Sequence, residues 1–276
     1  MKERITITVD SSILEKIDKK IDGFSFKNRS HAIEILLFNS LGENRPKKAI
    51  ILAGGIGKRF DPITAELPKV MIPFRGKPIM EHTIEFLRDQ NIRDILVSVG
   101  YKKERIKEYF GNGSKFGVNI IYLEEENPLG TAGPIRLAKP YLEDTFLVCN
   151  GDVLLNVDIN DMFLFHKKSG ALASIGLTTV DDPSSYGVAD MQGSKILNFV
   201  EKPKKENAPS KLINAGIYIM EPEVLDIIPQ GYAMVENDTF PKLAEKQKLF
   251  GYTYSGQWFD LGTPERYKTA LKQWKM

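Results

Sequence analysis

Cysteine is nearly absent from this sequence of 276 residues. The single one, Cys149, excludes a framework of disulfide bonds within the chain, so the fold must be held together by a packed core. It lies in the apolar run 146–149, which predicts a thiol buried in a strand. This use of cysteine is typical of the reducing cytoplasm, where we expect the protein to be.

Long hydrophobic runs are missing as well. The N-terminus, Met1 to Arg4, leads into alternating residues rather than into the apolar region of a signal peptide. No stretch approaches the length needed to span a bilayer. We therefore expect a soluble protein with no membrane partner.

The chain has no strong charge of one sign. Its 38 basic and 36 acidic residues leave a formal net charge of +2, so any surface that binds nucleic acid must be local. What the chain does have is a hydrophobic content of 42%, which is enough for a proper core. The length predicts one large α/β domain, alone or with a small appendage.

A glycine-rich loop follows the first buried strand, which we expect from residue 49 to residue 53. Gly54, Gly55 and Gly57 have no Cβ, so their N–H groups can ring phosphate oxygens. Arg59 and Lys69 supply positive charge for the β- and γ-phosphates of a triphosphate. The spacing matches neither the P-loop nor the Rossmann fingerprint. A plain glycine-rich turn stays open as the alternative, although the two cations count against it.

This loop carries a family resemblance. The signature loop of the sugar-1-phosphate nucleotidyltransferases is similar to Leu52-x-Gly-Gly-x-Gly-x-Arg59 with Pro68-Lys69 and Pro73 downstream. Lys58 stands where the family usually has threonine, and Phe60 where it usually has leucine; neither change removes a phosphate ligand. The resemblance covers residues 49–276 and is closest to the mannose-1-phosphate guanylyltransferase-like members. It implies nucleotide contacts from Leu52, Ala53, Gly54, Gly55, Gly57 and Lys58.

Further buried strands are expected at 94–100, 119–123 and 146–149, with helical segments between them. This alternation predicts an α/β fold with a doubly wound, mostly parallel sheet. The Rossmann-like nucleotidyltransferase fold that the resemblance implies is of the same kind.

The segment 124–134 leaves the third of these strands at its carboxyl end, where open α/β sheets bind ligands. It resembles the family's base-recognition segment, which implies that Glu125, Gly130 and Thr131 contact the nucleobase. An ionised carboxylate can accept both N1–H and N2–H of guanine, whereas uracil or thymine offers one N–H and prefers an amide. Guanine is therefore favoured. The alternative is that residues 124–126 form only a solvated acidic run.

Two aspartates are candidate metal ligands. Asp152 follows the buried strand 146–149 and resembles the family's Gly-Asp aspartate. Asp260 lies in a run that resembles the family's Trp-x-Asp-x-Gly-Thr-Pro motif. The resemblance implies that both hold Mg²⁺, a hard cation that bridges carboxylate and phosphate oxygens. Thr263 and Pro264 of the same run also fit the cap and first residue of a helix.

Three short stretches between the aspartates resemble the half of the family's site that holds the sugar phosphate. They are Tyr186-Gly187-Val188, Glu201-Lys202-Pro203 and Asn214-Ala215-Gly216-Ile217-Tyr218. The resemblance implies that Glu201 takes sugar hydroxyls, that Lys202 takes the phosphate, and that Asn214 and Gly216 contact the sugar. A Glu-Lys pair is usually a surface pair, and a glycine in a strand often marks a bulge. The order and joint presence of the stretches carry the inference.

The implied reaction is attack by a sugar-1-phosphate oxygen on the α-phosphorus of a nucleoside triphosphate, with GTP and mannose-1-phosphate favoured. Arg59 and Lys69 would neutralise the departing pyrophosphate, and Lys202 the nucleophile. One alternative is a uridylyl- or thymidylyltransferase that acts on glucose-1-phosphate. Another is a DNA-binding regulator that only senses a nucleotide sugar. The hexapeptide repeats of the β-helix found in many relatives are missing, so we expect no oligomerisation through such a helix.

The first 45 residues form a segment of their own. Residues 4–9 alternate with period two, which predicts a half-buried strand, and two amphipathic helices follow it. The order resembles the ribbon-helix-helix module, in which two chains pair their strands into a ribbon. We therefore expect a small ribbon-helix-helix domain at residues 1–45 that dimerises, followed by the nucleotidyltransferase domain at 49–276.

In that family the polar face of the ribbon enters the DNA major groove, which makes Arg4, Thr6 and Thr8 candidates for contacts with double-stranded DNA. Residues 1–48 carry ten basic and seven acidic residues, a small excess that favours DNA weakly. The alternative is a module that only holds two enzyme chains together.

Overall fold

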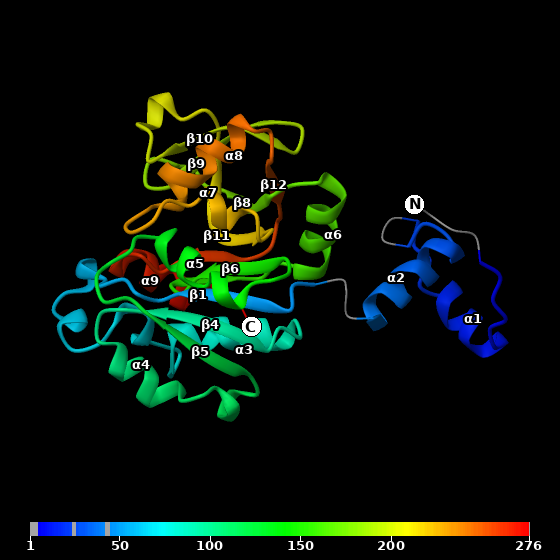
Figure 1. The fold of residues 1–276 in the computed structure, drawn as a ribbon, viewed down its shortest axis with the longest axis horizontal. Coiled ribbons are helices and arrows are strands. Elements are labelled where there is room, and N and C mark those ends of the chain that lie inside the picture. Colours follow the sequence, from blue (N-terminus) through cyan, green and yellow to red (C-terminus); the bar gives the residue numbers. More distant parts are fainter. Residues whose placement is uncertain (1–4, 24–25, 42–44, 276) are drawn as a thin grey trace. The chain divides into compact units, whose positions relative to one another are not determined.

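The computed structural model in Figure 1 describes residues 5–23, 26–41 and 45–275. The chain divides into two compact units, Met1–Asn44 and Arg45–Met276, which we call the N-terminal and the C-terminal unit. Each is described by itself.

The N-terminal unit contains the two expected helices, α1 (Ser11–Asp18) and α2 (Arg29–Leu41). Asp10 caps α1, because its carboxylate accepts hydrogen bonds from the Ser12 hydroxyl at 2.5 Å and from the Ser12 backbone N–H at 2.8 Å. These bonds hold the pKa of the Asp10 carboxyl below its usual value. Arg29, at the start of α2, forms an ion pair with Asp18, at the end of α1, with an N–O distance of 2.5 Å.

The strand expected at residues 4–9 is not present in this structure: residues 5–10 have no regular secondary structure. Ile5 and Ile7, which were expected on its buried face, are 70% and 52% exposed. A strand needs a neighbour to pair its N–H and C=O groups, and in a ribbon-helix-helix that neighbour belongs to a second chain. Of the proposed DNA contacts, Thr6 and Thr8 are exposed, and Arg4 lies outside the described residues.

Four parallel strands form the first half of the sheet in the C-terminal unit. In spatial order they are β5 (Asn119–Glu124), β4 (Asp94–Val99), β1 (Lys48–Leu52) and β6 (Phe146–Asn150). Helices α3 (Ile79–Asp89), α4 (Lys103–Phe110) and α5 (Gly133–Leu137) lie between them in the sequence. The apolar runs of β1, β4 and β6 are buried as predicted, with Ile50, Val97 and Val148 at 0% exposure, whereas the edge strand β5 leaves Ile121 45% exposed. Cys149 is also buried, and burial raises the pKa of its thiol.

The second half of the sheet is different. Beyond β6 the order continues with β11 (Leu212–Met220), β8 (Ala173–Thr179), β12 (Leu249–Thr253), β10 (Lys195–Glu201) and β9 (Gly187–Gln192). β11 runs antiparallel to β6 and β8, and β10 runs antiparallel to β12 and β9. The sheet is therefore mixed, and the prediction of a mostly parallel sheet is wrong for this half. Only residues 193–194 join β9 to β10, whereas a parallel pair needs a crossover of about a dozen residues.

Two short strand pairs and four further α-helices belong to the same unit. The strand pairs are β2 (Pro73–Phe74) with β3 (Lys77–Pro78), and β7 (Val153–Leu155) with β13 (Trp258–Asp260). The helices are α6 (Ile159–Ser169), α7 (Val224–Ile227), α8 (Phe240–Glu245) and α9 (Pro264–Gln273). None of the helices described is long and apolar enough to cross a membrane.

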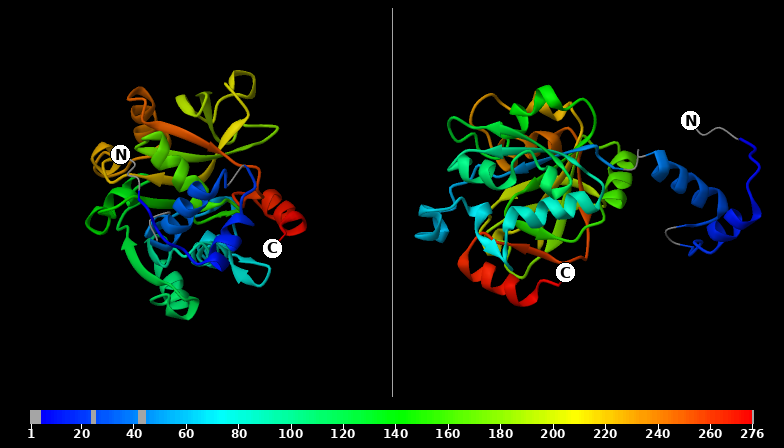
Figure 2. Two further views of the ribbon diagram at one scale, coloured as in Figure 1. Left: turned by 90° about the vertical axis from the view of Figure 1, so that its right-hand side faces the viewer. Right: turned by 90° about the horizontal axis from the view of Figure 1, so that it is seen from below.

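Helices cover both faces of the large sheet. The Phe165 ring of α6 lies 5.5 Å from the ring of Tyr252 in β12. Leu249, on the opposite face of β12, belongs to a core cluster with Phe240 and Leu243 of α8. Figure 2 shows α9, coloured red, at the outside of the unit, where it packs on a second core cluster that contains Phe74. The sheet therefore forms the middle layer.

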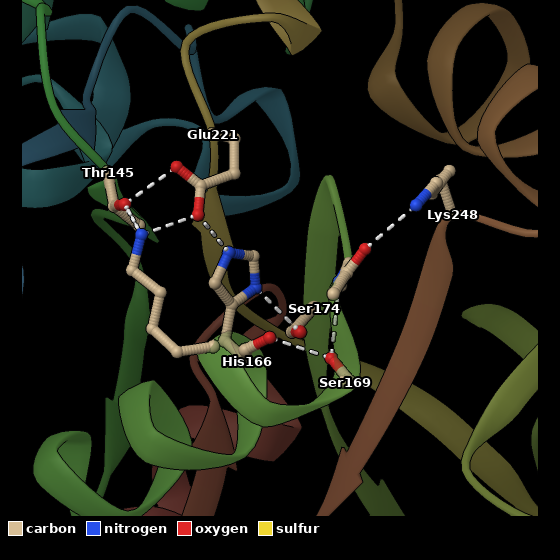
Figure 3. A network of polar contacts seen from close by, with 9 residues as sticks. Thr145, His166, Ser169, Ser174, Glu221 and Lys248 are labelled. Carbon is tan, nitrogen blue, oxygen red and sulfur yellow. Dashed lines mark hydrogen bonds and ion pairs between the residues drawn. The ribbon is translucent and has the colours of Figure 1, made fainter. Parts of the chain in front are cut away.

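A partly buried polar network closes one edge of the sheet (Figure 3). Glu221, just after β11, accepts hydrogen bonds from Thr145, just before β6, and from Lys167, both at 2.7 Å. His166 Nε2 lies 3.2 Å from the Glu221 carboxylate, and His166 Nδ1 lies 2.8 Å from the Ser174 hydroxyl. Burial opposes the charge on Glu221, but the bonds from His166, Lys167 and Thr145 together lower its pKa to about 2. The other edge, where β1 and β6 end, contains the clefts described below.

Candidate functional site

Two adjoining clefts open at the carboxyl ends of β1 and β6. The chain runs from β1 towards β4 and β5 on one side and then returns to β6 on the other, so the strand order reverses at β1. Ligands of open α/β sheets bind at such a switch point. The first cleft has a volume of about 450 Å³ and the second about 190 Å³. Lys69, Asn150 and Asp152 line both, so the clefts meet at these side chains.

The first cleft collects residues that were predicted to bind a nucleotide. They come from the end of β1, the loop that follows it and the segment after β5, and are Leu52, Ala53, Gly54, Gly55, Lys58, Lys69, Glu125, Gly130 and Thr131. Segments about 75 residues apart in the sequence therefore form one wall, because β1 and β5 end at the same edge of the sheet.

Two glycines of the loop allow close contacts. A Cβ on Gly54 would lie 2.3 Å from the Glu125 carboxylate oxygen Oε1. Gly57 has a φ of +75°, in the left-handed region, and a Cβ there would lie 2.6 Å from Cβ of Lys69. The glycines thus let Glu125 and Lys69 lie against the loop. The predicted bonds between their amides and phosphate oxygens stay a prediction.

The acidic run after β5 divides into surface and cleft residues. Glu124 is exposed and pairs with Lys103 at 2.7 Å and with Lys107, and hydrogen bonds from these two lysines lower its pKa to about 2. Glu125 points inward instead, where its carboxylate accepts hydrogen bonds from the Ser98 hydroxyl and, at 2.9 Å, from the backbone N–H of Leu129. The solvated-run alternative therefore describes Glu124 but not Glu125.

The second cleft collects the residues predicted for the sugar phosphate and the metal. They are Asp152, Tyr186, Gly187, Glu201, Lys202, Asn214, Gly216 and Asp260. Arg59 and Lys69, which were predicted for the phosphates of the triphosphate, line this cleft as well. Arg59 lines this cleft, whereas its neighbour Lys58 lines the first. The cations of the loop are therefore divided between the two clefts.

The backbone around Asn214 and Gly216 forms an irregularity in β11. The pairing of β11 with β8 shifts register between Asn214 and Tyr218, and Gly216 has a φ of +76°. The Asn214 side chain accepts a hydrogen bond from the Gly216 N–H at 2.8 Å and donates one to the Tyr218 hydroxyl at 2.9 Å. The glycine does mark a bulge, and the bulge faces the cleft.

Lys202 has an unusual backbone for a lysine. Its φ is +47°, and its N–H donates to the Tyr186 carbonyl at 2.9 Å. Its ammonium pairs with Glu201 at 2.7 Å, yet the side chain stays 54% exposed. The ammonium is therefore held at the rim of the second cleft with access to solvent.

The two aspartates are brought together by the pairing of β7 with β13. Asp260 lies opposite Val153, and the N–H of the next residue, Leu261, donates to the Asp152 carbonyl at 3.0 Å. Burial raises the pKa of Asp260, and the charge of Asp152 raises it further. Lys69 pairs with Asp152 and Arg266 with Asp260. Within the described part of the chain, no three His, Cys, Asp or Glu side chains converge as a metal cluster.

Sequence reasoning missed several side chains of the clefts, among them Ser98, Asn150, Glu236 and Arg266. The guanidinium carbon of Arg266 lies 4.5 Å from the centroid of the Tyr186 ring, and the guanidinium also pairs with Asp260. No motif marks these residues, because an isolated charged or polar residue in a sequence is usually a surface residue.

Glu236 connects the two clefts. Its carboxylate lines the second cleft and accepts a hydrogen bond at 2.6 Å from the Thr131 hydroxyl, which lines the first. The Thr131 oxygen in turn accepts one from the Val235 N–H at 2.9 Å. Glu236 is 9% exposed, and burial raises the pKa of its carboxyl. The π-helical turn Val235–Thr239 that carries it is a rare geometry found often at functional sites.

This geometry can be compared with known proteins. The family model of the nucleotidyl transferases matches residues 48–275. A mannose-1-phosphate guanyltransferase from Yarrowia lipolytica is 42% identical over 229 residues, which are 80% of this chain and 62% of that relative. The chain therefore spans about three fifths of the length of this curated relative.

Two solved structures share the α/β fold of the C-terminal unit. A Bacillus anthracis protein, assigned as a glucose-1-phosphate thymidylyltransferase, is 28% identical with a TM-score of 0.75, over 83% of this chain and 96% of that one. HddC from Yersinia pseudotuberculosis, complexed with GMP-PN, is 28% identical with a TM-score of 0.70, over 83% and 100%. Since the family model covers most of the sequence and the fold is shared, the chain belongs to the nucleotidyl transferase family.

Proposed function

We propose that the C-terminal unit transfers a nucleotidyl group from a nucleoside triphosphate to a sugar 1-phosphate, with GTP and mannose-1-phosphate as the favoured pair. The observation that carries the proposal is the meeting of two clefts at Lys69, Asn150 and Asp152. A triphosphate in one cleft and a sugar phosphate in the other would meet at a cation and a carboxylate. The name of the Yarrowia relative and the GMP-PN bound to the Yersinia protein support this pair of substrates.

In this reaction a phosphate oxygen of the sugar 1-phosphate forms a bond to the α-phosphorus. The bond from the α-phosphorus to the bridging oxygen breaks, and pyrophosphate leaves with the electron pair. The protein needs to form no covalent bond and acts by positioning and by neutralising charge. Lys58 and Lys69 line the cleft of the triphosphate, while Arg59 and Lys202 line the cleft of the sugar phosphate.

The donor set fits a magnesium ion. Asp152 and Asp260 offer two carboxylates, and Mg²⁺ is usually held by one or two carboxylates together with substrate phosphates. Burial raises the pKa of Asp260 most and the nearby charge of Asp152 raises it further, and a divalent cation between the two carboxylates would offset both effects. When bound there, Mg²⁺ would supply positive charge for the reacting phosphates. We propose that these two aspartates hold it.

Glu125 supports guanine as the base. Its bonds from Ser98 and Leu129 fix the carboxylate at the cleft and use two of its roughly four acceptor positions, so two remain for N1–H and N2–H of guanine. The alternative, a uridylyl- or thymidylyltransferase acting on glucose-1-phosphate, is favoured by the assigned activity of the Bacillus protein.

The experiment that decides is pyrophosphate release, measured over a matrix of GTP, ATP, UTP, CTP and dTTP against mannose-1-phosphate and glucose-1-phosphate, with Mg²⁺ or with chelator. The proposal expects the highest kcat/KM for GTP with mannose-1-phosphate and no turnover with chelator. A highest value for UTP or dTTP with glucose-1-phosphate would support the alternative. No release with any pair would refute the enzyme assignment.

For the N-terminal unit we propose the ribbon-helix-helix arrangement, formed with a second copy of the chain. The support is that so small a unit leaves five apolar side chains exposed, namely Ile5, Ile7, Ile13, Ile21 and Leu37.

The buried thiol of Cys149 in turn fits the cytoplasmic location that we propose for the whole chain.

Binding of double-stranded DNA by the ribbon is a further proposal, supported by the exposed Thr6 and Thr8. Selection from random duplexes by gel shift tests it, with Thr6→Ala as the variant. An enriched sequence that Thr6→Ala no longer prefers would support base contacts. If the protein is a dimer but enriches no DNA sequence, the module only holds two enzyme chains together, and the DNA-binding regulator has no support.

A further inference from the structure

Tyr232 is conspicuous in the C-terminal unit. It is 68% exposed, the highest value among the large apolar and aromatic side chains described between residues 45 and 275. It also lines the first cleft, together with Glu125, Gly130 and Met234. An exposed aromatic ring on an outer surface needs no explanation, but a ring at the wall of a ligand cleft presents a face that a ligand can cover.

The segment that carries Tyr232 is fixed on the base-recognition loop. The Ala233 N–H donates to the Leu129 carbonyl at 3.0 Å, and the Ala132 N–H donates to the Ala233 carbonyl at 2.9 Å. The two backbones are so close that a Cβ on Gly130 would lie 2.3 Å from the Ala233 oxygen. Two hydrogen bonds and this close packing hold the backbone of Tyr232 at a set position beside the loop.

Contacts within the protein do not account for the ring. The Tyr232 hydroxyl donates to the Met234 sulfur at 3.5 Å, and a thioether is a weak acceptor. A tyrosine that is 68% exposed contributes little to the core. Its aromatic character therefore points to a ligand that stacks.

We propose that the Tyr232 ring stacks on the nucleobase of the bound triphosphate, an inference that rests on the proposed function. Every base presents a π face, and a tyrosine loses little conformational entropy when it is covered, because it has only two side-chain torsions. A purine covers more of the ring than a pyrimidine does. Tyr232 thus adds to affinity for all the triphosphates and adds more for the purines GTP and ATP than for UTP, CTP or dTTP, while Glu125 selects guanine by hydrogen bonds.

Three variants of the full-length protein test this: Tyr232→Ala, Tyr232→Phe and Tyr232→Trp. GTP and UTP binding is measured by calorimetry with Mg²⁺ and no sugar, alongside steady-state turnover. Tyr232→Ala should weaken GTP binding about 5- to 150-fold, the range for loss of one stacked base, and should weaken UTP binding less. The KM of the sugar 1-phosphate should stay unchanged. Tyr232→Phe should bind GTP as the wild type does, because the stacking face is kept.

Tyr232→Trp supplies a spectroscopic readout. GTP should quench the fluorescence of the added indole. A titration of the wild type measures any change in the fluorescence of Trp258 and Trp274, and the quenching in Tyr232→Trp should be larger. The matched control is Tyr141→Ala, which removes a tyrosine that is 38% exposed on another segment and should leave GTP binding unchanged.

The inference is overturned if Tyr232→Ala binds GTP like the wild type, or if Tyr232→Phe is as impaired as Tyr232→Ala. An equal loss in Tyr141→Ala would also overturn it. Failure of the proposed function has a separate signature: a wild-type protein that releases no pyrophosphate refutes the reaction, whereas calorimetry still reads the stacking directly. A wild type that binds no nucleoside triphosphate refutes both.

Discussion

At the scale of residues, the site is a set of charges that nearly balance. Asp152 has Lys69 beside it and Asp260 has Arg266, and both pairs are only partly exposed. Partly buried carboxylates are costly without such partners, so the cations stabilise an arrangement of two close negative groups. A change that neutralises Asp152 removes its pairing with Lys69 but also its repulsion of Asp260, so the two effects on folding oppose each other, whereas any bound cation loses a ligand.

Asp152→Asn is expected to lower turnover by about 100-fold or more, because an amide is a poor ligand for a hard cation, and to leave the fold intact. Pyrophosphate release in millimolar Mg²⁺ measures the first effect and thermal unfolding the second. The control is Asp144→Asn, which changes an exposed aspartate that pairs with Lys47 at 3.1 Å and should do nothing. Wild-type turnover in Asp152→Asn would show that the metal assignment is wrong.

Glu125→Gln is expected to reduce the ratio of kcat/KM for GTP to that for UTP by about tenfold, because the amide removes an acceptor that guanine needs and offers a donor to uracil. Competition between the two triphosphates measures the ratio directly. Glu126→Gln, at the exposed neighbouring position, is the matched control. An unchanged ratio would remove Glu125 from the base pocket.

At the scale of elements, the sheet uses its two edges differently. At the edge with the clefts, β1 ends at Leu52 and leads into the glycine-rich loop, while β6 ends at Asn150, and these residues line the cavities. At the opposite edge, the polar groups that precede β6 and follow β11 satisfy one another in the network around Glu221. A partly buried network of this kind stabilises the fold without contacting the site.

Glu221→Gln should lower the free energy of unfolding at pH 7 by about 1–3 kcal/mol, because it leaves buried donors without a carboxylate. The folded-state pKa of Glu221, about 2, lies below its usual value of 4.5. Its contribution is therefore fully present above about pH 4.5 and is lost as the pH falls towards 2. Urea denaturation from pH 7 to pH 3 should show a smaller loss of stability on acidification in the variant.

The exposed Glu223→Gln serves as the control for this network, and turnover at pH 7 should be preserved in both variants. Identical pH profiles for wild type and Glu221→Gln would mean that the network does not hold the carboxylate in its charged form.

At the scale of the whole molecule, the two units differ in how completely they bury their own apolar side chains. The C-terminal unit buries its own core and carries both clefts. The N-terminal unit has two helices and leaves Ile5, Ile7 and Leu37 at least half exposed. A surface of this kind on so small a unit is typical of a segment that is completed by a second chain.

Deletion of residues 1–45 should convert a dimer into a monomer or a weaker oligomer and should preserve turnover, because both clefts lie beyond residue 45. Sedimentation of full-length and truncated protein at several concentrations measures the first effect, and pyrophosphate release the second. Substitution of Ile5 and Ile7 by serine in the full chain should have the same effect on association. A truncated protein that stays a dimer would place the contact in the C-terminal unit.

Local patterns predicted much of the fold. The four parallel strands β5, β4, β1 and β6 were found because each contains a short run rich in apolar residues, and β1, β4 and β6 are buried on both faces. Both helices of the N-terminal unit were found from their spacing and caps. The ribbon strand was predicted but is not formed by residues 5–10, and the antiparallel half of the sheet was not predicted. Both differences arise because strand pairing depends on which segments meet, and a single run of residues specifies neither its partner nor its register.

The sequence by itself determined the chemistry available: a glycine loop with cations, two aspartates at strand ends and a family resemblance that joins them. Only the tertiary structure decided how these groups are shared between two clefts, that Arg59 faces one and Lys58 the other, and that Glu125 points inward while Glu124 faces solvent. Ser98, Tyr232, Glu236 and Arg266 entered the site in the same way. Motifs report neighbours along the chain, whereas a cleft is formed by strand ends and loops that the sheet brings together from distant positions.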